Sequence, residues 1–168
     1  GQLYHRQDFG SIIVPNTGGF RPFVAKINGN GDWQWVNAES SGRFGGWAFA
    51  VATDAAGNPY ITGTMGGGQD SGNTFFGLPF PKAGESPFVA KFNGATGAAT
   101  WVTNAPTQGF YALSNIGKEI AVLSDGSAYV GGHFYGRGVF GSTTLTPLQY
   151  ADGDVTMFLA RISSAGQW

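Results

Sequence analysis

Two short turns carry the side chains of this sequence best suited to bind a cation. Asp54 and Asn58 bracket one of them, and Asp125 precedes Gly126 in the other. Calcium takes about six to eight oxygen ligands from carboxylates and carbonyls, so Asp54, Asn58 and Asp125 are candidate ligands. Each turn supplies only one carboxylate, however, and Asx turns explain the same residues. We therefore predict no metal and no cofactor, with calcium as the weaker alternative.

Flat aromatic side chains are the second set of candidate binding residues in the sequence. Aromatic faces beside polar donors suit the binding of sugars or polypeptides. Aromatic residues that do not recur from one part of the chain to the next are the best surface candidates. On this basis the candidate ligand-binding residues are Trp47, Phe110, Tyr111 and Tyr135. Trp35 and Trp101 do recur, and we expect both to lie in the core between structural units.

Catalytic chemistry has little support in the sequence. A glycosidase needs two carboxyl groups flanking a sugar bond, and no pattern singles out a pair among Glu39, Asp70, Glu85, Glu119, Asp152 and Asp154. The Gly-x-Ser-x-Gly elbow of a serine hydrolase is missing. The sequence has no cysteine, which excludes disulfides, thiolate metal sites and cysteine nucleophiles. We predict that the chain is not an enzyme.

Charge also restricts the partners. The chain has 9 Lys and Arg against 10 Asp and Glu, and charged residues make up 11% of it. Nucleic acids and anionic membranes both need clustered basic residues. No apolar stretch approaches the roughly 18 to 20 residues of a membrane span. We therefore expect no nucleic-acid partner and no membrane span.

The elements that must position these residues form a repeat. The tetrapeptide Phe23-Val24-Ala25-Lys26 returns at 88–91 and, slightly altered, at 158–161. Two other landmarks recur in the same order, namely Phe9-Gly10, Phe76-Gly77 and Phe140-Gly141, followed by Trp35, Trp101 and Trp168. A period of about 65 to 70 residues indicates a solenoid, a propeller or a bead-like array.

Each unit of the repeat is predicted to contain four short antiparallel strands and an added ribbon. Residues 48–53 form a short apolar run, and residues 59–63 are rich in β-branched and aromatic types. A turn rich in Asp, Gly and Asn separates the two segments, which is typical of a hairpin. The copy at 120–132 is expected to contract this turn to Asp125-Gly126. The Phe-Val-Ala-Lys segment and the following tryptophan provide strands three and four, and the Phe-Gly steps lie in the ribbon. Gly or Pro interrupts nearly every window with helical spacing, so helix content should be close to nil.

Four antiparallel strands per repeated unit are typical of a β-propeller blade. We predict an all-β fold of two complete blades and two partial flanking blades. The expected division is a partial blade over 1–36, a blade over 37–102, and a blade over 103–168 that ends at the start of the next. Two complete blades cannot close a ring of about four to eight. The chain is therefore expected to be part of a longer protein, or to complete its ring with other copies.

The repeat resembles a known family, the bacterial β-propeller repeat often abbreviated SBBP. The residues that carry the resemblance are 50–63, the Phe-Gly step, the Phe-Val-Ala-Lys strand and the tryptophan after it. The chain departs from the family pattern at 105–116 and at Asp125-Gly126. The resemblance implies a secreted or surface protein of bacteria, and it carries over no catalytic residue.

The functional prediction is a non-catalytic extracellular or cell-surface β-propeller segment with a structural or adhesive role. Its blade loops would bind a protein or a polysaccharide. One alternative is an architectural subunit of a fibre or other assembly, built from copies of this chain by strand or edge pairing. Another is a scaffold within a larger enzyme.

Overall fold

The computed structural model describes residues 1–15, 18–40, 45–66, 74–80, 84–108, 115–147 and 155–168. Every regular element in these ranges is a β-strand, which confirms the predicted all-β class. None of the described residues forms a helix of the length and apolar character that crossing a membrane requires.

Ten of the strands form three antiparallel sheets that follow one another along the chain. The first sheet consists of β1 (Gln2–Leu3), β4 (Arg21–Ile27) and β5 (Trp33–Ala38). The second consists of β6 (Gly46–Thr53), β7 (Pro59–Met65), β10 (Ser86–Phe92) and β11 (Ala99–Asn104). The third consists of β12 (Ile116–Val122), β13 (Ala128–Tyr135) and β16 (Val155–Ile162).

A two-stranded ribbon accompanies each sheet, as the sequence predicts. The ribbons are β2 (Gln7–Phe9) with β3 (Ile12–Val14), β8 (Thr74–Phe75) with β9 (Leu78–Pro79), and β14 (Gly138–Phe140) with β15 (Thr143–Leu145). The repeated Phe-Gly step lies at the tip of each ribbon, where its glycine adopts a positive φ. Phe9, Phe76 and Phe140 are buried at these tips, so each ribbon contributes one phenylalanine to the core.

Strand β10 shows how the three sheets share their cores. Its side chains alternate between two faces, as expected for a strand. Phe88 and Phe92 pack with Val24 of the first sheet in one cluster. Val89, on the opposite face, packs with Phe134 and other residues of the third sheet. Strand β10 is therefore buried on both faces, between the two neighbouring sheets.

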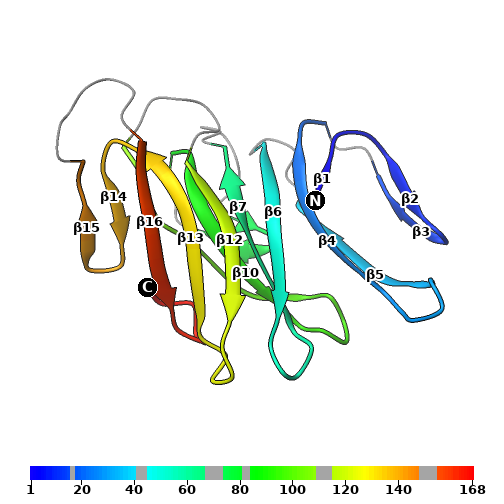
Figure 1. Ribbon diagram of the computed structural model, residues 1–168. Helices are drawn as coiled ribbons and strands as arrows, with labels where there is room; N and C mark the ends of the chain where they lie inside the picture. Colours follow the sequence, from blue (N-terminus) through cyan, green and yellow to red (C-terminus); the bar gives the residue numbers. More distant parts are fainter. Residues whose placement is uncertain (16–17, 41–44, 67–73, 81–83, 109–114, 148–154) are drawn as a thin grey trace.

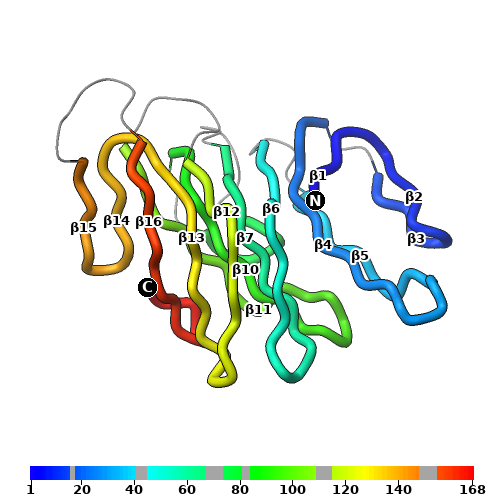
Figure 2. The backbone as a smooth tube through the Cα atoms, in the orientation of Figure 1, coloured from blue at the N-terminus to red at the C-terminus, as the bar shows by residue number. Residues whose placement is uncertain are grey.

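The sheets follow one another across the molecule in chain order (Figure 1). The backbone trace in Figure 2 places the N-terminus beside the first sheet and the C-terminus beside the third. The described strands do not close into a ring, because the first and third sheets lie at opposite sides of the second and are not paired with each other. One sheet, at 46–104, has the expected four strands, whereas each sheet beside it has three.

The expected contraction of the second hairpin turn is wrong. Residues 54–58 join β6 to β7, and residues 123–127 join β12 to β13, so the two turns have the same length. Gly57 and Gly126 occupy matching places, each with a φ of 77°. The contraction was expected because Asp54 and Asp125 were matched. The register instead matches Asp54 with Leu123, since each donates its main-chain N–H to the residue that ends its turn.

The third tryptophan landmark also differs from expectation. Lys26 pairs with Trp35 and Lys91 pairs with Trp101, which confirms that these two tryptophans are equivalent. Trp168 matches Trp33 instead. Each of these two rings meets the phenylalanine of its ribbon edge-on, with centroids 5.0 Å apart for Trp33 and Phe9 and 5.3 Å for Trp168 and Phe140.

Candidate functional site

A continuous row of aromatic rings lies on the surface where the first sheet meets the second. Ring centroids are 4.4 Å apart for His5 and Tyr4, and 4.7 Å apart for Tyr4 and Phe20. The row continues from Phe20 to Trp47 at 6.0 Å and from Trp47 to Phe49 at 6.2 Å. We call these five residues the aromatic row.

Three separate segments position the aromatic row. Tyr4 and His5 follow β1, and Phe20 directly precedes β4. Trp47 and Phe49 both belong to β6. A bulge between Ala48 and Ala50 interrupts the ladder at this point. Bulges re-aim side chains locally. The aromatic row depends on both sheets, because Tyr4, His5 and Phe20 adjoin strands of the first sheet, whereas Trp47 and Phe49 belong to the second.

Much of the ring surface is open to solvent. Tyr4 is 49% exposed, Phe20 is 44% exposed and Phe49 is 48% exposed. Trp47, between the last two, is half-buried and thereby anchored. Contiguous exposed apolar surface of this kind marks an interaction site more often than scattered single residues do. The rings offer tilted apolar faces onto which the C–H face of a sugar or an apolar side chain can stack.

The sequence-based binding residues do not all meet at this site. Trp47 lies near the centre of the aromatic row. Tyr135 lies in the third sheet, where its main-chain N–H donates to Oδ1 of Asn115 at 2.8 Å. Phe110 and Tyr111 fall outside the described residues. Of the predicted set, the structure therefore places only Trp47 in the aromatic row.

Sequence reasoning missed the neighbours of Trp47. The closeness of Trp47 and Phe49 in the sequence was an available signal, because both fall in or beside the strand predicted at 48–53. No comparable signal links Tyr4 or Phe20 to Trp47. These residues are far apart in the chain, and only the packing of the first sheet against the second brings them together.

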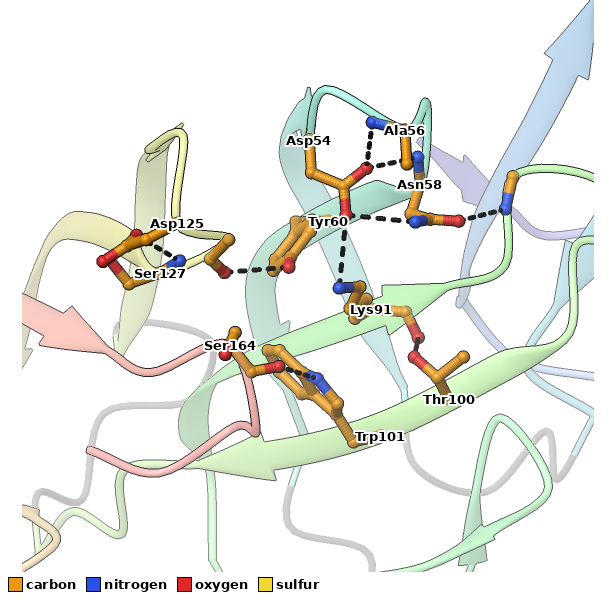
Figure 3. Close-up of polar contacts among 12 residues, drawn as sticks. Asp54, Ala56, Asn58, Tyr60, Lys91, Thr100, Trp101, Asp125, Ser127 and Ser164 are labelled. Carbon is orange, nitrogen blue, oxygen red and sulfur yellow. Dashed lines mark hydrogen bonds and ion pairs between the residues drawn. The ribbon is translucent and has the colours of Figure 1, made fainter.

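In the first candidate calcium turn, the carboxylate of Asp54 is paired with a basic side chain of the protein, Lys91. The Asp54 carboxylate accepts hydrogen bonds from the main-chain N–H groups of Ala56 and Asn58 and from the Asn58 amide. It also pairs with Nζ of Lys91 at 3.2 Å (Figure 3). The ammonium lies 4.8 Å from the centre of the Tyr60 ring. Among the described residues, no three His, Asp or Glu side chains gather in a group that could hold a metal.

Hydrogen bonding shifts the titration of this pair. Burial acts to raise the pKa of Asp54, but hydrogen bonds from Asn58 and Lys91 and the Lys91 charge together hold it below its ordinary value. Burial likewise acts to lower the pKa of Lys91, and its contacts with Tyr60 and Asp54 outweigh this and raise it. The charged form of each partner is therefore the stabilised one.

The second candidate turn repeats the arrangement with different residues. The Asp125 carboxylate accepts hydrogen bonds from the hydroxyl and main chain of Ser127, at 2.6 and 2.9 Å. Arg161, which replaces Lys91 in this sheet, donates to it at 2.9 Å. The Ser127 hydrogen bonds are the main cause that lowers the pKa of Asp125. Both turns thus join a hairpin to the third strand of its own sheet.

Two of the carboxylates considered for glycoside chemistry make structural contacts. Glu39 is buried, and its carboxylate accepts the main-chain N–H of Phe76. The Glu85 carboxylate accepts the main-chain N–H of Asn115 at 3.0 Å. Glu119 is exposed on β12. Asp70, Asp152 and Asp154 lie outside the described residues.

The recurring tryptophans lie between sheets, as predicted. The indole N–H of Trp35 donates to the carbonyl of Gly94 at 3.2 Å, and that of Trp101 donates to the carbonyl of Ser164 at 3.0 Å. Figure 3 shows the second of these contacts. Each bond runs from one sheet to the turn between strands three and four of the next.

Comparison with protein-family models and with curated proteins finds no match to this chain. The resemblance to the SBBP repeat therefore stays a prediction from the sequence.

Proposed function

We propose that this chain is a non-catalytic β-propeller segment, of the SBBP repeat type, from a secreted or cell-surface protein of a bacterium. Its role is adhesive, and its aromatic row binds a polysaccharide. The exposed row of five rings is the observation that carries this proposal. Stacking on exposed rings needs no charge, which agrees with the low charge of the chain.

Polysaccharide is favoured over protein as the ligand because the site is a row rather than a pocket. A linear chain of sugar rings offers successive apolar faces, and the aromatic row offers successive rings over several neighbouring positions. Tyr, Trp and His also carry polar atoms at the ring edge that can bond to sugar hydroxyls.

Affinity electrophoresis in native gels tests the proposal directly. The gels would contain soluble hydroxyethylcellulose, xylan, mannan or starch, and retardation by at least one of them is expected. Trp47→Ala should weaken the affinity for the retarding polysaccharide about tenfold, since losing one stacked ring costs on the order of 1–2 kcal/mol. Val51→Ala is the control, because Val51 is 62% exposed on the same strand as Trp47 but is not part of the aromatic row.

Two results would overturn the proposal. One is migration that none of the four polysaccharides changes. The other is equal retardation of the wild type and the Trp47→Ala variant, provided that circular dichroism shows the same β structure in both. Binding of a protein ligand by the same row would then become the better interpretation.

A further inference from the structure

Equivalent residues of the second and third sheets differ sharply in exposure. Tyr60 pairs with Lys91 in the second sheet, and Tyr129 pairs with Arg161 in the third, so the two tyrosines occupy the same place. Tyr60 is fully buried, whereas Tyr129 is 41% exposed. Val89 and Leu159 are equivalent in the same way, with exposures of 0% and 74%.

The third sheet is what buries this face of the second. Val89 packs with Ala128, Phe134 and Phe158 in one core cluster. The hydroxyl of Tyr60 donates to the carbonyl of Gly126 at 2.9 Å, across the same interface. The first sheet covers the opposite face of the second in a similar manner, through Val24 and Trp35. Each sheet thus presents the same face to the sheet that follows it.

The third sheet presents this face uncovered. Its exposed apolar residues are Val155 at 50%, Met157 at 84% and Leu159 at 74%, together with Tyr129. We call this set the outer face. Strands of monomeric proteins rarely expose several neighbouring large apolar residues, and such surfaces mark interaction sites.

The polar edge of the outer face is open as well. The side chains of Arg161 and its partner Asp125 are 55% and 57% exposed. In the second sheet Lys91 occupies the place of Arg161, and Lys91 and its own partner Asp54 are 18% and 12% exposed. A shallow depression of about 410 Å³ lies here, lined in part by Arg161, Ser127 and Ser164. The next sheet covers this place in the second unit, and nothing in the described chain covers it in the third.

The first sheet carries the complementary surface. Ile27 is 50% exposed, although its equivalents Phe92 and Ile162 are fully buried. Gly31 has open space around it, whereas the equivalent glycines, Gly97 and Gly166, lie against the indoles of Trp35 and Trp101 from the preceding sheet. Among the described residues, no sheet packs against this face of the first sheet, and none packs against the outer face of the third.

We propose that the outer face of one copy of this chain packs against the first sheet of a second copy. The contact continues the sheet-to-sheet packing that already occurs twice within the chain. It is heterologous, because two different surfaces meet. Such contacts generate a ring when the rotation closes and an open filament when it does not. Burial of the outer face is the driving force.

The test measures mass in solution over a wide range of concentrations, by sedimentation or by light scattering after gel filtration. The wild-type mass should rise with concentration. Leu159→Lys and Ile27→Lys should each remain monomeric, because each variant places a charge in one of the two contacting surfaces. Val51→Lys is the control: Val51 is 62% exposed on β6, outside both surfaces, and should associate like the wild type.

Mixing the two variants makes the test specific for head-to-tail packing. The Leu159→Lys copy keeps an intact first sheet, and the Ile27→Lys copy keeps an intact outer face. An equimolar mixture should therefore form one-to-one dimers and nothing larger. All variants must show wild-type circular dichroism and thermal midpoints, which is expected because the substituted residues are exposed.

Several results would overturn the proposal. A wild-type chain that remains monomeric at every concentration excludes it. Unchanged association of Leu159→Lys excludes the outer face, and unchanged association of Ile27→Lys excludes the first sheet as its partner. If the mixed variants remain monomeric, head-to-tail packing is excluded. None of these readouts depends on polysaccharide binding, so the two proposals fail or stand separately.

Discussion

The hydroxyl of Tyr60 donates a hydrogen bond of 2.9 Å to the main-chain carbonyl of Gly126 in the neighbouring sheet. Tyr60 is fully buried, and its ring also lies beneath the Lys91 ammonium. One side chain therefore links two sheets and, through Lys91, the Asp54 turn. This contact shows that the hairpin turns help to hold adjacent sheets together.

We expect Tyr60→Phe to lower the free energy of unfolding by about 1 kcal/mol, because the ring stays and only the hydrogen bond is lost. Urea denaturation followed by fluorescence measures this change. Tyr129→Phe is the control, since Tyr129 is partly exposed. Equal stabilities of the Tyr60→Phe variant and the wild type would show that the hydrogen bond contributes nothing net.

Glycines at equivalent turns should respond differently to substitution. Gly31 and Gly97 both have positive φ, of 88° and 73°, so alanine at either place strains the backbone by about 1–2 kcal/mol. A Cβ atom at Gly97 would also lie 2.6 Å from the Trp35 ring, whereas one at Gly31 would meet nothing within 4 Å. Gly97→Ala should therefore destabilise the fold clearly more than Gly31→Ala in thermal or urea unfolding. Equal losses of stability for the two variants would contradict the close packing of the Trp35 indole against Gly97.

Stability should depend on pH through the turn carboxylates. The pKa values of Asp54 and Asp125 are lower in the folded chain than in the unfolded one, so their contribution is present above about pH 4 and is lost as the pH falls through the folded values. The pKa of Lys91 is raised in the folded chain, so its effect on stability has the opposite pH dependence. Its contribution is present below about pH 10 and is lost at higher pH.

Urea unfolding between pH 2 and pH 6 tests the acid limb (about two units either side of the ordinary carboxyl range). Asp54→Asn should flatten the fall in stability relative to the wild type. Asp8→Asn is the control, because Asp8 and its partner Arg6 are both more than half exposed. An unchanged slope for Asp54→Asn would mean that its hydrogen bonds do not favour the folded state.

Equivalent strand residues should differ in their contribution to the fold. Val89→Ala removes buried methyl groups between two sheets and should cost about 1–3 kcal/mol. Leu159→Ala removes a larger side chain from an exposed place and should change stability by about 0.5 kcal/mol or less. Unfolding is best measured at low protein concentration, where association is least. A large loss for Leu159→Ala under these conditions would show that its side chain packs within the monomer.

Much of the local structure was predictable because it depends on neighbouring residues. The Phe-Val-Ala-Lys segment was correctly predicted as a strand, β10, and the Phe-Gly steps correctly marked the three ribbons. The register of the hairpin turns was not predictable in the same way. Asp54 and Asp125 looked equivalent by residue type, but the two ladders carry their bulges at the same place, at Phe49 and Lys118, and this register matches Asp54 with Leu123.

By itself, the sequence determined the repeated antiparallel strands that make up the described part of the chain, since period, alternation and turn chemistry are local properties. Only the tertiary structure decided which faces are covered and which are open. Leu159 repeats the place of Val89, yet its exposure depends on whether another sheet lies against it. The aromatic row is likewise a product of packing, because Tyr4, Phe20 and Trp47 come from separate segments that meet only when the first two sheets stack.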